Sequence, residues 1–94
     1  MSTEVLNDPS MNRYELLMDG ERIGATDYQI RDDTIVFLHT EIDPEHREHG
    51  LGSELARGAL NLVRAETDYR VVTRCPFMAA WVAKHPEYQD LLSR

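Results

Sequence analysis

The spacing of apolar side chains between residues 14 and 42 predicts three consecutive β-strands. Residues 14–18 and 22–30 flank Asp19-Gly20, a dipeptide that suits a tight type I′ hairpin turn. A second polar turn at residues 31–33 precedes residues 34–42, which are rich in β-branched and aromatic side chains. We therefore expect three antiparallel strands, with the third at the centre of the sheet.

The third predicted strand is apolar on both faces at its start. The two faces carry the pairs Ile35 with Phe37 and Val36 with Leu38. Such a pattern is expected where a sheet is covered on both sides. Because side chains alternate with period two, we expect His39 and Glu41 on the same face as Phe37.

A long helix is predicted after Gly50 and Gly52, where the apolar spacing changes to that of a helix face. The apolar positions on that face are Leu55, Ala59, Leu62 and Val63. The helix is expected to end near Glu66. Residues 69–73 then form a short fourth strand, which follows a helical crossover and should lie parallel to the third strand.

The C-terminal residues predict a second helix. Pro76 suits the first turn of a helix, and His85-Pro86 ends it. Phe77 and Trp81 stand at helical spacing and are most simply core residues. A last amphipathic turn carries Tyr88, Leu91 and Leu92.

Residues 1–12 mix Asn, Asp, Pro and Ser without periodicity, so we expect a flexible N-terminus there. Residues 13–94 then form a single small domain, which has little stability to spare at this size. The predicted fold class is α/β (α+β). It comprises three antiparallel strands, a long helix, a fourth strand parallel to the third, and a C-terminal helix.

The net charge and the cysteine content narrow the range of possible functions. Ten Lys and Arg against seventeen Asp and Glu give a net charge of −7. This balance argues against a broad surface for nucleic acid or anionic membranes, although an anionic ligand can bind in a locally positive pocket. The single cysteine, Cys75, can form neither an internal disulfide nor a cysteine-rich zinc site. Without a long apolar run or a secretory leader, the sequence favours a cytoplasmic protein that needs no metal.

The segment from Arg47 to Gly52 is the main candidate for a binding site. It precedes the long helix, where the first N–H groups have no intrahelical partner and the macrodipole adds about half a positive charge. Glycines let a phosphate approach the main chain, and Arg47 adds a forked cation. The spacing matches neither the Rossmann dinucleotide loop nor the Walker loop. One interpretation is a pyrophosphate site; the other is that Gly50 and Gly52 only permit a tight turn.

Five short strings stand out in the chain, in this order: Leu38-His39-Thr40-Glu41-Ile42, Pro44-Glu45-His46-Arg47, Gly50-Leu51-Gly52, Cys75-Pro76-Phe77 and His85-Pro86-Glu87-Tyr88. Together they resemble the short single-domain branch of the GNAT acetyltransferase superfamily. The Arg-x-x-Gly-x-Gly string that begins at Arg47 is similar to the acyl-CoA binding motif of that superfamily. The resemblance runs from about Tyr14 to Leu92.

The resemblance implies an acetyl-CoA-dependent N-acetyltransferase. The acceptor is an amine, either on a small molecule or at a protein lysine or N-terminus. The backbone of residues 40–42 would bind the pantetheine arm, and the amides of residues 48–52, with Arg47, would bind the pyrophosphate. The implied cofactor-binding residues are Thr40, Glu41, Ile42, Arg47, Glu48, His49, Gly50, Leu51 and Gly52. No nucleic-acid or membrane partner is implied, and we expect a monomer or a weak homodimer.

Two catalytic candidates follow from the same resemblance, Cys75 and His39. Cys75 is expected where the fourth strand meets the helix that begins at Pro76, next to Arg74, and both neighbours favour a reactive thiol. It would accept the acetyl group or take part in proton transfer, although most enzymes of the superfamily transfer directly from the thioester. Lone cysteines are also commonly small buried hydrophobic residues, so a structural role stays open.

His39 would line the acetyl end of the site, where a histidine side chain suits proton transfer near neutral pH. A histidine hydrogen-bonded for packing is the alternative. Glu41 could orient His39 or act as a base, or it could be a solvated carboxylate at the strand end.

The chain lacks segments that usually shape the amine pocket in this superfamily, so we expect an open and shallow acceptor site. The acidic composition favours a cationic acceptor. Two other functions remain open at this point: a non-catalytic acyl-CoA-binding module, and a protein-interaction module without a cofactor.

Overall fold

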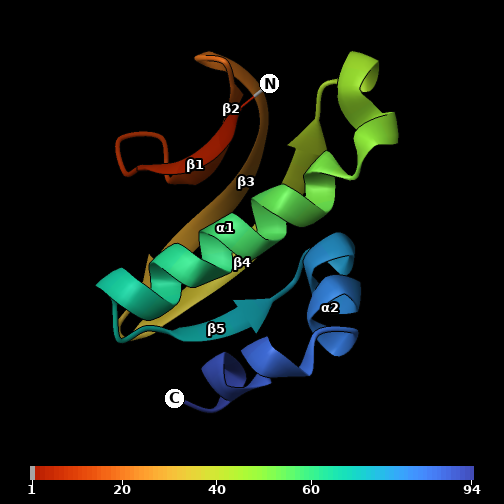
Figure 1. Ribbon diagram of the computed structural model, residues 1–94. Coiled ribbons are helices and arrows are strands. Elements are labelled where there is room, and N and C mark those ends of the chain that lie inside the picture. The colour runs from red at the N-terminus through yellow and green to blue at the C-terminus, as the bar shows by residue number, and fades with distance from the viewer. Residues whose placement is uncertain (1) are drawn as a thin grey trace.

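The computed structural model describes residues 2–94, apart from the side chains of residues 47–49 (Figure 1). The elements follow in the order β1 (Thr3–Asp8), β2 (Arg13–Met18), β3 (Glu21–Arg31), β4 (Thr34–Ile42), the 3₁₀ helix η1 (Pro44–His49), α1 (Leu51–Glu66), β5 (Arg70–Thr73), α2 (Pro76–Ala83) and the 3₁₀ helix η2 (Pro86–Ser93). The five strands form one sheet in the order β1-β2-β3-β4-β5.

The sheet confirms the predicted pairing of the central strands. Neighbouring strands from β1 to β4 are antiparallel, and β5 lies parallel to β4 after the α1 crossover. The turn between β2 and β3 has positive φ at both central residues, 50° at Asp19 and 87° at Gly20. A type I′ turn requires this pair of conformations, which match the right-handed twist of the strands.

The N-terminal segment differs from the prediction of an irregular terminus. Residues 3–8 form β1, which pairs with β2 in register from Thr3 opposite Met18 to Asp8 opposite Arg13. The segment is rich in residues that are depleted in strands, so its own sequence gives little sign of this structure. The pairing is decided by β2 and by Val5, which packs against the core.

The helices α1, α2 and η2 contribute to the core on one face of the sheet. Side chains of α1, α2 and η2 join Ile35, Phe37 and Val71 in one cluster, and Figure 1 shows α1 crossing over β4. Val36 is buried but belongs to neither apolar cluster, and Leu38 is exposed. The expectation of a sheet covered on both sides is therefore wrong for the described residues, which leave the face of Val36 without a helix.

A β-bulge in β4 overturns the predicted placement of His39. The register pairs Tyr28 with Phe37 but Asp27 with His39, so Leu38 is an extra residue on β4. An extra residue reverses the alternation of the side chains that follow it. His39 and Glu41 consequently lie on the open face and are exposed, not on the face of Phe37.

The C-terminal elements confirm most of the pattern. α1 ends at Glu66, and α2 starts at Pro76 as predicted. Trp81 is buried and donates from Nε1 to Ser53 Oγ at 2.8 Å, which ties α2 to α1. Phe77, by contrast, is 40% exposed, so the prediction that it is a core residue is wrong.

Candidate functional site

The candidate site is a groove that opens where β4 and β5 separate. The amides of Arg74 and Cys75 both donate to the carbonyl of Phe37, at 2.9 and 3.0 Å, and the parallel pairing stops there. Beyond this point β4 continues to Ile42, whereas the segment that follows β5 turns into α2. The groove has a volume of about 580 Å³ and is lined by His39, Thr40, Glu41, Ile42, Gly50, Gly52, Ser53 and Phe77.

One wall of the groove is the edge of β4. The amide of Asp43 donates to the carbonyl of Ile23 at 2.7 Å. The main-chain groups of the alternate residues before it, Glu41 and His39, therefore also point toward β3. Main-chain groups alternate along an antiparallel strand, and those of Thr40 and Ile42 therefore point toward the side that β5 has left. At Thr40 this edge can bond to an extended ligand lying along β4.

The other wall includes the N-terminus of α1. Gly50 precedes the helix with φ of 68°, and no described side chain caps this end. The first bond within the helix is from the Glu54 amide to the Gly50 carbonyl at 3.3 Å, so the amides of residues 51–53 need acceptors outside the helix. With the helix dipole, these donors favour an anion.

Gly52 and Phe77 meet across the mouth of the groove. A Cβ at Gly52 would lie 3.1 Å from Phe77 Cζ, which is closer than ordinary contact. The glycine thus lets an aromatic ring of α2 lie against the first turn of α1. Phe77 is a groove residue that sequence reasoning missed; its exposed side became visible only when α2 was placed.

Cys75 lies at the predicted junction and immediately precedes α2. Its side chain is buried with 3% exposed, and its thiol donates to Thr40 Oγ1 at 3.3 Å. Thr40 Oγ1 also lies 3.0 Å from Thr26 Oγ1 on β3. The three side chains form a small polar cluster under the groove. Thr26 was not predicted, because nothing in the sequence distinguishes this threonine from others in strands.

The side chains of His39 and Cys75 lie on different faces of the sheet. The bulge turns His39 and Glu41 onto the open face, whereas Cys75 packs in the core on the helix-covered face. Glu41 also lines a second, smaller hollow of about 280 Å³ that includes Arg22 and Asp43. The two catalytic candidates therefore approach the strand separation from opposite sides.

The predicted phosphate segment is only partly described. Arg47, Glu48 and His49 belong to η1, but their side chains lie outside the described part of the structure. Leu51 is buried in the smaller apolar cluster, so only its main chain is available to a ligand. Among the described side chains, His46 Nδ1 is the buried polar atom without a hydrogen-bond partner.

Neither a metal site nor a membrane-spanning helix is found among the described residues. No three His, Cys, Asp or Glu side chains gather closely enough there to hold a metal ion. Among residues 2–94, no helix is both long and apolar enough to cross a membrane.

Comparison with known proteins adds one match. A family model described as GCN5-related N-acetyl-transferase (Acetyltransf_CG) matches residues 13–91. No curated protein matches the chain. The matched range extends from β2 to η2 and includes both walls of the groove.

Proposed function

The chain belongs to the GCN5-related N-acetyltransferase family, and from this premise we propose that it transfers an acetyl group from acetyl-CoA to an amine. The observation that carries the proposal is the groove between β4 and the start of α1. It combines a strand edge for an extended arm with uncapped helix amides for an anion. The strand edge is suited to the pantetheine arm of coenzyme A, and the helix amides are suited to its pyrophosphate.

In this proposal the donor lies along β4. The main chain of Thr40, Glu41 and Ile42 binds the pantetheine arm, with the groove-facing groups of Thr40 nearest to it. The amides of residues 48–52 and the Arg47 guanidinium bind the pyrophosphate. The positive φ of Gly50 supports this role, because it turns the chain sharply into the helix whose amides face the groove.

The amine approaches from the open face of the sheet. His39 and Glu41 are exposed there, beside the strand separation. His39 is then placed to accept the proton that the acceptor nitrogen loses, and Glu41 to attract a cationic acceptor. The described residues leave this face without a helix, which supports an open acceptor site for either a small amine or a protein chain.

Cys75 acts in proton transfer in this proposal, and the acetyl group passes directly from the thioester to the amine. Burial of the thiol supports this choice, because an acetyl carrier must reach the thioester carbonyl. The lone cysteine is also consistent with a reducing compartment such as the cytosol.

Calorimetry with coenzyme A and acetyl-CoA tests the donor. We expect heat at micromolar to millimolar ligand and a matching rise in thermal stability, since a ligand that binds only the native state stabilises it. Folded protein that gives no heat at millimolar coenzyme A overturns the proposal and leaves a protein-interaction module.

A screen of amines, diamines and lysine peptides with acetyl-CoA then tests turnover. Binding without release of coenzyme A for any acceptor indicates a non-catalytic acyl-CoA-binding module. Intact mass after incubation with acetyl-CoA alone separates the two routes of transfer, because only a covalent route leaves an acetyl group on Cys75.

A further inference from the structure

Thr26 is the part of the site that the proposed chemistry has not used. It is fully buried on β3 and is, among the described residues, the one buried side chain that is neither apolar, aromatic nor a thiol. Its Oγ1 lies 3.0 Å from Thr40 Oγ1, and either oxygen can be the donor. The Cys75 thiol donates to the same Thr40 oxygen at 3.3 Å.

The direction of the Thr26–Thr40 bond follows from the burial of Thr26. A hydroxyl hydrogen that is removed from water needs an acceptor, and leaving it without one is costly. Among the described contacts, Thr40 Oγ1 is the only acceptor within reach of the Thr26 side chain. If Thr40 were the donor, the hydrogen of Thr26 would have no partner. Thr26 therefore donates to Thr40.

This direction determines where the Thr40 hydrogen points. A hydroxyl group has one hydrogen and two acceptor positions. Thr26 and Cys75 occupy both acceptor positions of Thr40 Oγ1, and the hydrogen of Thr40 remains for another acceptor. Thr40 is half-buried and lines the groove, so an acceptor atom in the groove completes its bonding.

We propose that the Thr40 hydroxyl donates this hydrogen to the sulfur of the departing coenzyme A. Cys75 supplies the proton that replaces it, and Thr26 is a positioning residue that holds Thr40 in the donating orientation. The inference rests on the proposed acetyl transfer and assigns its leaving-group step. It also gives the buried Cys75 thiol a route to the groove, through Thr40.

The step balances as follows. The nitrogen of the neutral amine forms a bond to the acetyl carbon, and the carbon–sulfur bond breaks with its electron pair on sulfur. Sulfur takes the proton of Thr40, whose oxygen takes the proton of Cys75. The acceptor nitrogen releases one proton to His39, which passes it to solvent, and the Cys75 thiolate regains one from solvent before the next cycle.

Titration of the thiol of bound coenzyme A tests the inference without turnover. The ultraviolet absorbance of the thiolate is followed with pH, and the complex with desulfo-coenzyme A provides the background, Cys75 included. We expect a midpoint about one pH unit lower in the native protein than in Thr40→Val, because a hydrogen bond to the thiolate favours it. Thr40→Ser retains the hydroxyl and should restore the native midpoint.

Thr26 is tested by Thr26→Val, which keeps the shape and removes the hydroxyl, with Thr26→Ser as the matched control. We expect the thiol midpoint to move part of the way toward that of Thr40→Val. The kcat for acetyl transfer should fall about tenfold with an unchanged KM for acetyl-CoA, as expected for weakened acid catalysis. Thr26→Ser should restore both quantities.

The outcomes separate this inference from the function it rests on. If coenzyme A binds but the midpoint is the same in the native protein and Thr40→Val, the inference is overturned and the proposed donor site stands. If Thr26→Val and Thr26→Ser behave alike, Thr26 has no positioning role. If coenzyme A does not bind to the native protein, the proposed function itself fails.

Discussion

At the C-terminal end of α1, side chains donate hydrogen bonds to main-chain carbonyls of the last turn. At the N-terminal end, by contrast, no described side chain caps the amides. Both ends face the same requirement, because the first four N–H groups and the last four C=O groups of a helix have no intrahelical partner. Among the described side chains, part of that requirement is met at the C-terminal end and none of it at the N-terminal end.

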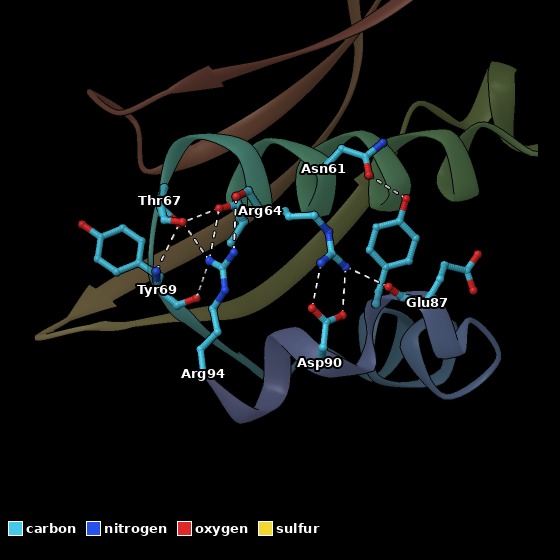
Figure 2. Close-up of polar contacts among 9 residues, drawn as sticks. Asn61, Arg64, Thr67, Tyr69, Glu87, Asp90 and Arg94 are labelled. Carbon is cyan, nitrogen blue, oxygen red and sulfur yellow. Dashed lines mark hydrogen bonds and ion pairs between the residues drawn. The ribbon is translucent and has the colours of Figure 1, made fainter.

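The C-terminal end is held by two side chains (Figure 2). Thr67 Oγ1 donates to the Val63 carbonyl at 2.7 Å. The Arg94 guanidinium donates to the carbonyls of Thr67 and Tyr69 at 2.8 and 3.2 Å, and to those of Val63 and Arg64 at 3.4 and 3.3 Å. One residue of the C-terminal segment therefore bonds the end of α1 and the start of the next strand together.

Neighbouring contacts fasten η2 along the same helix. Arg64 and Asp90 form a bidentate pair at 2.7 and 2.9 Å, and Arg64 also donates to the Glu87 carbonyl at 2.8 Å (Figure 2). These bonds from Arg64 lower the pKa of Asp90 below its usual value. The Tyr88 hydroxyl donates to Asn61 Oδ1 at 2.7 Å.

The difference between the two ends separates structural from functional residues. Groups whose bonds are complete within the chain stabilise the fold, and removing them should change unfolding but not ligand affinity. Groups whose bonds are completed by a ligand should behave in the opposite way. Variants at the two ends of α1 test this division.

Arg47→Ala should produce the largest change, at the N-terminal end. Loss of a forked cation from the proposed phosphate site is expected to weaken coenzyme A binding by 10- to 100-fold, or about 1.4 to 2.8 kcal/mol, with little change in unfolding. Calorimetry and urea unfolding measure the two quantities. Arg31→Ala, at the end of β3 opposite the first residue of β4, is the control, and equal affinity of both variants would remove Arg47 from the site.

Gly50→Ala should affect both stability and binding. A residue with a Cβ at φ of 68° is expected to cost about 1 kcal/mol of unfolding free energy, and the altered turn should weaken coenzyme A binding about fivefold. Gly20→Ala is the matched control, because its φ of 87° is also positive and its Cβ would also meet no atom within 4 Å. A loss of affinity in Gly20→Ala as well would show that strain alone explains it.

Arg94→Ala should act on stability alone. The end of α1 loses its bonds from the guanidinium, and we expect the unfolding free energy to fall by about 1 kcal/mol. Coenzyme A affinity should stay within about twofold, because the donors lie at the opposite end of the helix. Arg94→Lys keeps the charge without the fork and should recover little. A large loss of affinity in either variant would contradict the division between the two ends.

Tyr14→Phe should give the smallest effect, confined to alkaline pH. Burial raises the pKa of Tyr14 to about 12, and the charges of Tyr28 and of Glu66, at the end of α1, add to the shift. Because the folded value exceeds the unfolded value of about 10, this contribution is complete below pH 10 and is lost as pH rises toward 12. Urea unfolding across that window should show a shallower decline in the variant; identical slopes would contradict the assignment.

Local sequence patterns predicted much of the fold because the physical causes are local. Asp19-Gly20 predicted the hairpin, since both residues tolerate positive φ. Pro76 predicted the start of α2, since a missing N–H is harmless in the first turn. β1 was missed because half of its residues are of types depleted in strands, so that its own pattern gives no strand signal and its structure depends on pairing with β2.

The candidate site was predicted less completely than the fold. The groove-lining positions Thr40, Gly50 and Gly52 were identified from the resemblance. His39 was assigned to the wrong face, because the bulge at Leu38 arises where β4 keeps its bonds to β3 while β5 leaves. No pattern of residues within β4 predicts this β-bulge. The roles proposed for Cys75 and His39 stay predictions until the experiments above are done.

The sequence by itself determined the elements whose conformation is set by neighbours a few residues away: the hairpin turn, the long amphipathic helix, and the glycine at its start. Only the tertiary structure decided which faces and ends meet. It placed Thr26 and Cys75 around one hydroxyl of Thr40, turned His39 outward, and brought Arg94 to carbonyls at one end of α1 while the other end faces the groove. These contacts join residues far apart in the chain, and their geometry follows from packing and strand register rather than from local preference.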